Sequence, residues 1–499
     1  RSRLQTPSAP RSVLSNGRTI LKMLRITISL VAALAGSPAI ATDAVRGEAT
    51  NFTSPKGTLE RCVRIAPIPG GEYSERDLKD EEAFCGIDFY ASDVALCPKT
   101  WSTSPGMMVY DIASGPYAND RAAFERNACK EGKSAKDLAR DDLAKFKVTM
   151  NAEGTSGTYS VSPLLYYHFS RYFDMAVLVP VTVWRSMDVA MHNSEVARPG
   201  LAISGHNRSA RMNHAGWKHL VDAEANPASY SPTDDIFTAD RTQIYGILTS
   251  SPGHRYGSEI NGTRKSGWGK GQNLDFQKTP AFLALREDAP LIEAIDAGLA
   301  KGRRDGQINR DLGPDVPREQ MAYWMREISE IVLLDFIFSQ QDRVGNIDFT
   351  PYYYWVEAGE LKHKKAKHHE PGDGDVPAGA IRLRRTNLND NDAGGRVAYA
   401  NFAKTTQMLE KLRHFDGKVY ERLVSLDRDL QSQGPIFQWL STSLGLKDSE
   451  VTQVVKNAAL ATGILQESCR SGRLRFDLNP KEFFLSGDVL PDGVDCDPA

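Results

Sequence analysis

The chain has 499 residues, of which 41% are hydrophobic and 25% are charged, and its formal net charge is −2. This composition is typical of a folded protein with two or three lobes and excludes wholesale disorder. The first 41 residues contain six basic and no acidic residues, so the remainder has 55 basic against 63 acidic residues, a net charge of −8. An acidic chain of this kind gives no support for nucleic-acid binding.

The N-terminal stretch has the features of a targeting signal. Basic residues extend to Arg25, an apolar segment covers residues 26–34, and small residues at 37–41 form a cleavage pattern. We expect residues 1–41 to be an upstream extension and a signal peptide. The apolar segment is shorter than the roughly 20 residues that a membrane helix needs. The sequence therefore predicts a periplasmic or secreted protein with no integral membrane segment after signal cleavage.

Six cysteines follow the predicted cleavage site: Cys62, Cys85, Cys97, Cys129, Cys469 and Cys496. An even number of cysteines in an oxidising compartment predicts up to three disulfides, and their distribution, four near the front and two near the end, favours separate local groups. Loose spacing without a Cys-x-x-Cys pair argues against a zinc site. Residues 42 to about 110 are rich in Gly, Pro and charge, which indicates a loop-rich segment, and we expect residues 42–142 to form a cysteine-containing N-terminal cap.

A half-buried strand is predicted over residues 143–150, where apolar and polar side chains alternate. Phe146 and Val148 fall on one face of this strand, and Lys145 and Lys147 fall together on the other. The two lysines therefore share one face of the predicted strand.

A turn, a helix and a further strand are predicted next. The turn contains Gly154 and Gly157, the helix covers residues 161–173 with Pro163 in its first turn, and the β-branched run at 177–184 indicates a strand. We interpret the two glycines as a plain turn.

The middle of the chain, from Arg185 to Pro280, lacks sustained periodicity and predicts an irregular insert, with one short strand at 243–248. Its cations are interpreted as a solvated surface, with contact to an anionic substrate as the alternative. They are His254, Arg255, Arg264, Lys265 and Lys270.

The clearest predicted helix covers residues 317–341, because its apolar residues recur at three- and four-residue steps. The helix runs into a polar loop that offers a carboxylate at Asp342 and a carboxamide at Asn346. Phosphoryl-transfer sites use an Asp to position the attacking hydroxyl and an Asn to hold a metal ion, and a second Asp from a later segment completes the metal site.

A second acidic segment follows a predicted strand at 381–384. Asp390 and Asp392 lie in the run Asn389-Asp390-Asn391-Asp392, directly after that strand, which is the expected position of a metal-binding Asp. Amphipathic helices are predicted over residues 403–430 and 450–469.

The order of these features resembles the atypical kinase superfamily that includes the phosphatidylinositol kinases, the HipA toxin kinases and the secretory-pathway kinases related to the Golgi casein kinase. In those families the catalytic loop reads roughly Asp-Arg-His-x-x-Asn, and the metal-binding turn is often Asp-Asn-Gly or Asp-Phe-Gly. The resemblance covers residues 143–184 and 321–430. It implies a disulfide-stapled α+β fold with two lobes: a smaller mixed-sheet N-lobe with the irregular insert over 143–300, a mainly helical C-lobe over 301–485, and a tail over 486–499.

The resemblance also implies a role for each site residue. Lys147, or Lys145 as its alternative, contacts the phosphates of ATP, and Asp342 acts as the catalytic base. Asn346 and Asp390 bind Mg²⁺ or Mn²⁺, and Asp392 is an alternative or additional ligand. The implied activity moves the ATP γ-phosphate to a hydroxyl of a protein, a sugar or a lipid headgroup.

This sequence departs from the family pattern at three positions. Val344 stands where the catalytic loop usually has His. Ser162 and Pro163 stand where a helix Glu usually pairs with the strand Lys, which leaves Glu153 as the nearest candidate substitute. The Gly-x-x-Gly of the turn follows the strand Lys, whereas the phosphate-covering glycine loop of kinases precedes it.

Three other hypotheses explain the same residues. Asp342 pairs with Arg343 or caps the helix, and the later aspartates are polar turn residues. The fold is kept as a catalytically inactive binding or scaffold protein, since an exported enzyme needs ATP outside the cytoplasm. The chain is an unrelated secreted glycan- or peptide-binding protein that uses its Trp- and Tyr-bearing loops, first of all residues 352–355.

Overall fold

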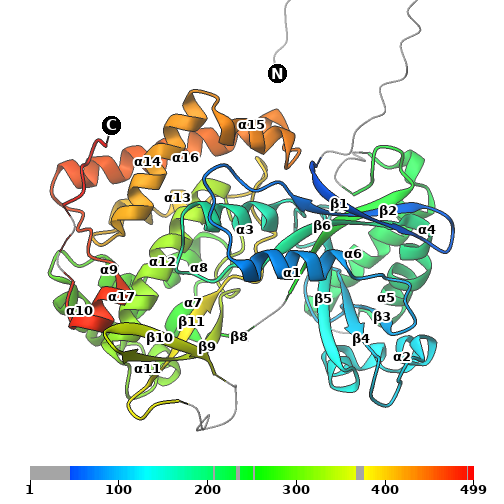
Figure 1. The fold of residues 1–499 in the computed structure, drawn as a ribbon, viewed down its shortest axis with the longest axis horizontal. Coiled ribbons are helices and arrows are strands. Elements are labelled where there is room, and N and C mark those ends of the chain that lie inside the picture. The colour runs from blue at the N-terminus through cyan, green and yellow to red at the C-terminus, as the bar shows by residue number, and fades with distance from the viewer. Residues whose placement is uncertain are drawn as a thin grey trace, which may run out of the picture. The chain divides into compact units, whose positions relative to one another are not determined.

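The structure is a computed structural model, and it describes residues 45–205, 208–231, 236–250, 253–366, 376–489, 491 and 493–498. It combines helices with antiparallel sheets, as the predicted α+β class requires (Figure 1). The predicted extension and signal peptide lie outside the described residues. From residue 43 onward the chain belongs to one compact unit.

A seven-stranded sheet forms one part of this unit. Its strand order is β1-β2-β6-β7-β5-β4-β3, and every pairing is antiparallel, whereas the resemblance implied a mixed sheet. Hairpins join β1 to β2 and β3 to β4, and a hairpin connection makes neighbouring strands antiparallel. The strands are β1 Gly47–Thr53, β2 Leu59–Ile65, β3 Val94–Pro98, β4 Met107–Asp111, β5 Asp141–Val148, β6 Thr182–Asp188 and β7 Gln243–Thr249.

The expected N-terminal cap over residues 42–142 is a substantial part of that sheet. It contributes β1 to β4 and the helix α1 (Glu75–Cys85), so the predicted division between residues 142 and 143 falls within one sheet. Strands β3 and β4 are five residues long and buried at every position. A strand covered on both faces shows no alternation of apolar and polar residues, which is why the sequence pattern did not reveal them.

The predicted strand at 143–150 and helix at 161–173 are confirmed as β5 and α3 (Ser162–Tyr172). The strand predicted over 177–184 begins later, at Thr182, and the short strand at 243–248 is confirmed as β7. Phe146 and Val148 on β5 are buried in the main hydrophobic core, which also includes most of α3. The lysine-bearing face of β5 is thereby turned away from the core.

The segment from Arg185 to Pro280 is not the irregular insert that its sequence indicates. Its longest helix, α6, has 18 residues, but Gly216 interrupts its short apolar stripe, in which Trp217 and Leu220 are buried. The segment also contains α4 Val189–His192, the π-helix η2 Asn193–Ala197, α5 Arg198–Ile203, α6 Arg208–Ala225, the 3-10 helix η3 Pro227–Ser229, α7 Ser258–Asn261 and α8 Lys270–Phe276.

Helices dominate the rest of the chain, around the buried 21-residue α12 (Arg318–Phe338), which confirms the predicted helix. The helix predicted at 450–469 is α16, and the stretch 403–430 is divided into α13, η5 and α14. The other elements here are α9 Pro280–Leu285, α10 Leu291–Gly302, α11 Gly306–Leu312, α13 Phe402–Thr405, η5 Leu409–Lys411, α14 Gly417–Gln431, α15 Pro435–Thr442, α16 Asp448–Arg470 and α17 Pro480–Ser486. Two short elements precede β5: α2 Arg121–Asn127 and η1 Cys129–Leu138.

A small second sheet has the order β10-β9-β11, with β8 pairing to β9. Its strands are β8 His254–Arg255, β9 Asp348–Glu357, β10 Glu360–Lys365 and β11 Ile381–Asn387. The predicted strand at 381–384 is confirmed as the start of β11. Residues 352–355 lie in β9, where Tyr354 is buried against Tyr323 and Leu383, so this aromatic run is partly a packing feature.

Three disulfides are present, as the cysteine count predicts: Cys62–Cys85, Cys97–Cys129 and Cys469–Cys496. Each joins cysteines that are near in sequence, which confirms the expected local groups. Within the described part of the chain, no helix combines the length and apolarity needed to cross a bilayer.

Candidate active site

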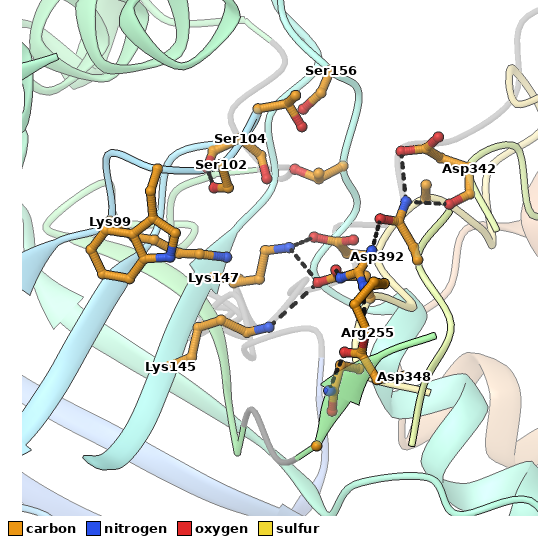
Figure 2. Close-up of a pocket in the computed structure, with 18 of the residues that line it drawn as sticks. Lys99, Ser102, Ser104, Lys145, Lys147, Ser156, Arg255, Asp342, Asp348 and Asp392 are labelled. Atoms are coloured by element: carbon orange, nitrogen blue, oxygen red, sulfur yellow. Dashed lines mark hydrogen bonds and ion pairs between the residues drawn. The ribbon is translucent and has the colours of Figure 1, made fainter. Parts of the chain in front are cut away.

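A cavity of about 730 Å³ lies between the lysine-bearing face of β5 and the loops at the edge of the small sheet. Figure 2 shows Lys99, Lys145 and Lys147 on one side of it and Asp342, Asp348 and Asp392 on the other. Six of the seven site residues predicted from the sequence line this cavity: Lys145, Lys147, Asp342, Asn346, Asp390 and Asp392.

The cationic wall of the cavity is built on the seven-stranded sheet. Lys145 and Lys147 are 2% and 5% exposed, and the half-buried Lys99, just after β3, joins them. Burial, together with the positive charges of Lys145 and Lys147, lowers the pKa of Lys99 to about 7. Burial likewise lowers the pKa of Lys145. Three lysines on one wall make a strongly anion-attracting surface.

The anionic wall begins with the loop after α12, which is held by a buried ion pair. Ser339 ends the helix in the left-handed conformation (φ 55°), and Arg343 Nε then lies 3.0 Å from Asp335 Oδ2. The Tyr166 hydroxyl donates a 2.7 Å hydrogen bond to the same carboxylate. Arg343 therefore pairs with Asp335 on the helix, and the hypothesis of a pair between Asp342 and Arg343 is wrong.

The Asp342 carboxylate faces the cavity and accepts two side-chain hydrogen bonds. Trp268 Nε1 donates to Oδ1 at 3.1 Å, and Asn346 Nδ2 donates to Oδ2 at 3.2 Å. Burial raises the pKa of Asp342 to about 6, the negative charges of Asp392 and Asp390 add to this rise, and the Trp268 hydrogen bond opposes it. A carboxylate with a pKa near neutrality is suited to accept a proton during catalysis.

The turn after β11 completes the anionic wall. Arg343 Nη2 donates a 2.9 Å hydrogen bond to Asn391 Oδ1, so one guanidinium joins this turn to the loop after α12. Asp390 Oδ1 lies 3.6 Å from Lys145 Nζ and 3.8 Å from Lys147 Nζ. Burial raises the pKa of Asp390, but the neighbouring cations outweigh it and hold the pKa well below its usual range.

Lys147 is the residue that connects the two walls most closely. Its ammonium contacts the Asp392 carboxylate as well as that of Asp390. Burial lowers the pKa of Lys147, but these two carboxylates reverse the effect and raise the pKa above its ordinary value. A lysine that stays charged next to two metal-ligand candidates is suited to hold a phosphate beside a metal ion.

Arg255 on β8 lies between the two predicted metal ligands. Its guanidinium donates to Asn346 Oδ1 at 2.6 Å and to Asp390 Oδ2 at 3.2 Å, and its Nε lies 2.5 Å from Asp348 Oδ1. The same side chain donates to the Gly345 carbonyl. The Arg255 guanidinium thus already occupies the position where the Asn346 and Asp390 side chains converge.

Asn346 and Asp390 have the donor atoms that Mg²⁺ prefers. Mg²⁺ is usually bound by one or two carboxylates with substrate phosphates and water, so this pair fits the ion once Arg255 moves aside. No group of three His, Cys, Asp or Glu side chains suited to a metal occurs in the described part of the chain.

No protein-family model matches this chain. A search of the curated proteins likewise finds no relative. The function must therefore be argued from the cavity and its residues.

Glu153 is the one predicted site residue that the structure does not bring to the cavity. It is exposed in the turn after β5, whereas Ser156 and Gly157 of the same turn line the cavity. Lys147 instead pairs with two carboxylates of the turn after β11. Ser162, at the position of the missing helix Glu, donates a 2.5 Å hydrogen bond to the Asn391 carbonyl and so ties α3 to that turn.

No sequence pattern indicated Lys99, Trp268 or Asp348 as site residues. Arg255 was interpreted as part of a solvated surface, but it lines the cavity together with His254 and Arg264. The alternative of contact with an anionic substrate fits these three residues, whereas Lys265 and Lys270 do not line the cavity. No local spacing identifies such residues, because long-range pairing alone brings β3 and β8 to the cavity.

Proposed function

We propose that this chain is an exported, kinase-like phosphotransferase that moves the γ-phosphate of ATP to a hydroxyl acceptor. The observation that carries the proposal is the convergence of Lys147, Asp342, Asn346 and Asp390 in one cavity. These are the residue types, in the chain order, that phosphoryl transfer uses. Three disulfides support an oxidising compartment for the mature chain.

The order of elements around the cavity also supports the proposal. The β3–β4 hairpin precedes the Lys-bearing β5, and its loop lines the cavity with Ser102, Thr103 and Ser104. Kinases use a hairpin loop before the Lys strand to cover the phosphates. The helix α3 follows β5, and the catalytic loop and the metal-binding turn flank β9 to β11. We propose the kinase-like division into two lobes on this basis.

Each residue has a defined task in this proposal. Lys147 holds the phosphates, and Asn346 and Asp390 hold Mg²⁺ or Mn²⁺, which neutralises charge on the transferring group. Asp342 orients the acceptor hydroxyl and accepts its proton. Arg343 contacts no substrate and positions both acidic segments through Asp335 and Asn391.

A second candidate function is nucleotide binding without transfer. The contacts of Arg255 with Asn346 and Asp390 favour it, because a guanidinium that stays in place excludes the metal ion. In this alternative the chain is an inactive kinase-like binding or scaffold protein.

Two measurements test the proposal. ATP with Mg²⁺ or Mn²⁺ raises the melting temperature if the folded state binds nucleotide. Transfer of radiolabel from γ-labelled ATP to peptide, sugar or lipid hydroxyls then separates an active enzyme from an inactive binder. Absence of any ATP-dependent stabilisation refutes both candidates and favours an unrelated glycan- or peptide-binding protein.

A further inference from the structure

Trp268 has an unusual position at the cavity. Its side chain is 65% exposed, yet its indole N–H donates to the carboxylate of Asp342 and its ring packs edge-on against Phe402, with centroids 5.8 Å apart. Glycines with positive φ flank it, at Gly267 (79°) and Gly269 (89°). The segment therefore holds a large aromatic ring open to solvent, directly beside the proposed base.

Two unpartnered polar groups lie on the same cavity. Gln272, four residues after Trp268 and on α8, is 4% exposed, and its Nε2 has no hydrogen-bond partner among the described residues. The Ser156 hydroxyl is also buried without a partner there. A buried donor that lacks a partner costs free energy, and such groups call for a specific explanation. Both residues line the cavity, so a ligand that enters it can satisfy them.

We propose that Trp268, Gln272 and Ser156 form an acceptor subsite, and that the acceptor is a sugar hydroxyl. A sugar ring presents an apolar C–H face, which suits the exposed indole, and polar groups at its rim, which suit the carboxamide and the hydroxyl. The inference rests on the proposed phosphotransfer and names its substrate class. The hydroxyl-bearing side chain of a serine or threonine in a protein acceptor lacks such a face.

The proposed reaction balances without a further reactant. The sugar oxygen forms a bond to the γ-phosphorus of ATP, and the bond from that phosphorus to the β,γ-bridging oxygen breaks. ADP leaves with the bonding electron pair, and the hydroxyl proton passes to the Asp342 carboxylate. The Trp268 N–H holds Oδ1 of this carboxylate and the Asn346 amide holds Oδ2, and a remaining lone pair of the carboxylate accepts the proton.

Binding without nucleotide gives the first test. Saturation-transfer NMR with methyl glycosides of glucose, galactose, mannose and xylose should detect binding of at least one by the wild-type chain. Trp268→Ala should weaken that binding by about tenfold, whereas Trp268→Phe keeps a ring and most of the affinity. Gln272→Leu should weaken it by about threefold to tenfold. Leu59→Ala, which shortens a 57% exposed side chain outside the cavity, should leave it unchanged.

Transfer kinetics give the second test. Trp268→Ala should raise the KM for the sugar and leave the KM for ATP unchanged. Trp268→Phe, which keeps an aromatic ring, should keep most of the wild-type affinity and therefore a KM for the sugar close to that of the wild-type chain. A merely structural role for Trp268 predicts no such selective effect on the KM for the sugar.

The outcomes separate this inference from the proposed function. No glycoside binding by the wild-type chain, binding that Trp268→Ala leaves intact, or transfer to peptides with none to sugars overturns the acceptor subsite. Glycoside binding that depends on Trp268, without any ATP-dependent stabilisation, supports the sugar site and refutes only the phosphotransfer.

Discussion

The two walls of the cavity are built in different ways. Lys145 and Lys147 project from β5, where sheet pairing fixes the backbone and the two-residue period fixes the side. Asp342 and Asp390 lie on two loops far apart in sequence, and these loops share Arg343 as a common partner. A strand thus presents cations through regular structure, whereas the carboxylates depend on one buried guanidinium. The following substitutions and pH measurements test this difference between the two walls.

The largest effect is expected from Asp342→Asn. If Asp342 accepts the acceptor proton, the isosteric amide should lower the transfer rate by about 10²- to 10⁴-fold while ATP still stabilises the fold. Single-turnover transfer and a thermal shift with ATP measure the two quantities. Asp296→Asn, which alters an exposed carboxylate paired with Arg318, is the control and should keep full activity. Wild-type transfer by Asp342→Asn would remove Asp342 from the mechanism.

Arg343→Ala tests the anionic wall directly. The substitution leaves Asp335 buried without its cation, which should cost about 3–5 kcal/mol of unfolding free energy. Urea unfolding measures the loss. Arg318→Ala is the matched control, because its pair with Asp296 is about half exposed and should contribute far less to the unfolding free energy. Equal losses of unfolding free energy in the two variants would mean that groups other than Arg343 stabilise the anionic wall.

Lys147→Met tests the cationic wall. A hydrogen bond to a charged group contributes about 1.5–3 kcal/mol, so ATP binding should weaken by about tenfold to a hundredfold. Lys145→Met should have the smaller effect, because Lys145 pairs with Asp390 alone whereas Lys147 contacts Asp390 and Asp392. Calorimetric titration of ATP into each variant measures and compares the two affinities. A larger loss with Lys145→Met would identify Lys145 as the nucleotide lysine.

The pH profile tests the state of Asp342. With a pKa of about 6, its carboxylate is ionised above that pH and becomes protonated as the pH falls through it. Transfer should therefore fall about tenfold per pH unit below pH 6 and level off above pH 7. Rates of the wild-type chain between pH 5 and pH 8 measure this, with unfolding checked at each pH. A profile that is flat across pH 6 contradicts the assignment of Asp342 as base.

Arg255→Ala is expected to have the smallest effect. Removing the guanidinium frees Asn346 and Asp390 for the metal ion, so ATP-dependent stabilisation should reach its midpoint at about two- to fivefold lower Mg²⁺ concentration. Thermal shifts at fixed ATP and varied Mg²⁺ measure the midpoint, with Arg318→Ala as the control. A higher midpoint in Arg255→Ala would show that Arg255 assists the metal instead of competing with it.

The sequence was most informative where one residue pattern sufficed. The alternation around Lys145 and Lys147 predicted β5, the apolar period before Asp342 predicted α12, and the extended run at 381–384 predicted the start of β11. Their convergence in one cavity was expected only from the order of the elements. Patterns of this kind depend on neighbours along the chain, and they persist in the folded structure.

The sequence was least informative where distant segments meet. Lys99 reaches the cavity because β3 pairs at the far edge of the large sheet, and Arg255 does so because β8 pairs with β9. Trp268 lies in a segment without periodicity, and only its hydrogen bond to Asp342 in the folded structure indicates that its exposed ring belongs to the site. Glu153 was chosen for its nearness in sequence, but its side chain is exposed outside the cavity, whereas Ser156 and Gly157 of the same turn line it.

The Cys97–Cys129 disulfide makes the geometry of the cationic wall depend on the oxidation state of two cysteines. Cys97 lies in β3, two residues before Lys99, and its partner begins η1, from which Lys133 and Lys136 also line the cavity. The bond joins these lysines into one covalently restrained segment, which limits their freedom before any anion arrives. Material made under reducing conditions lacks that restraint, so thiol content has to be measured before any comparison of anion affinity between preparations.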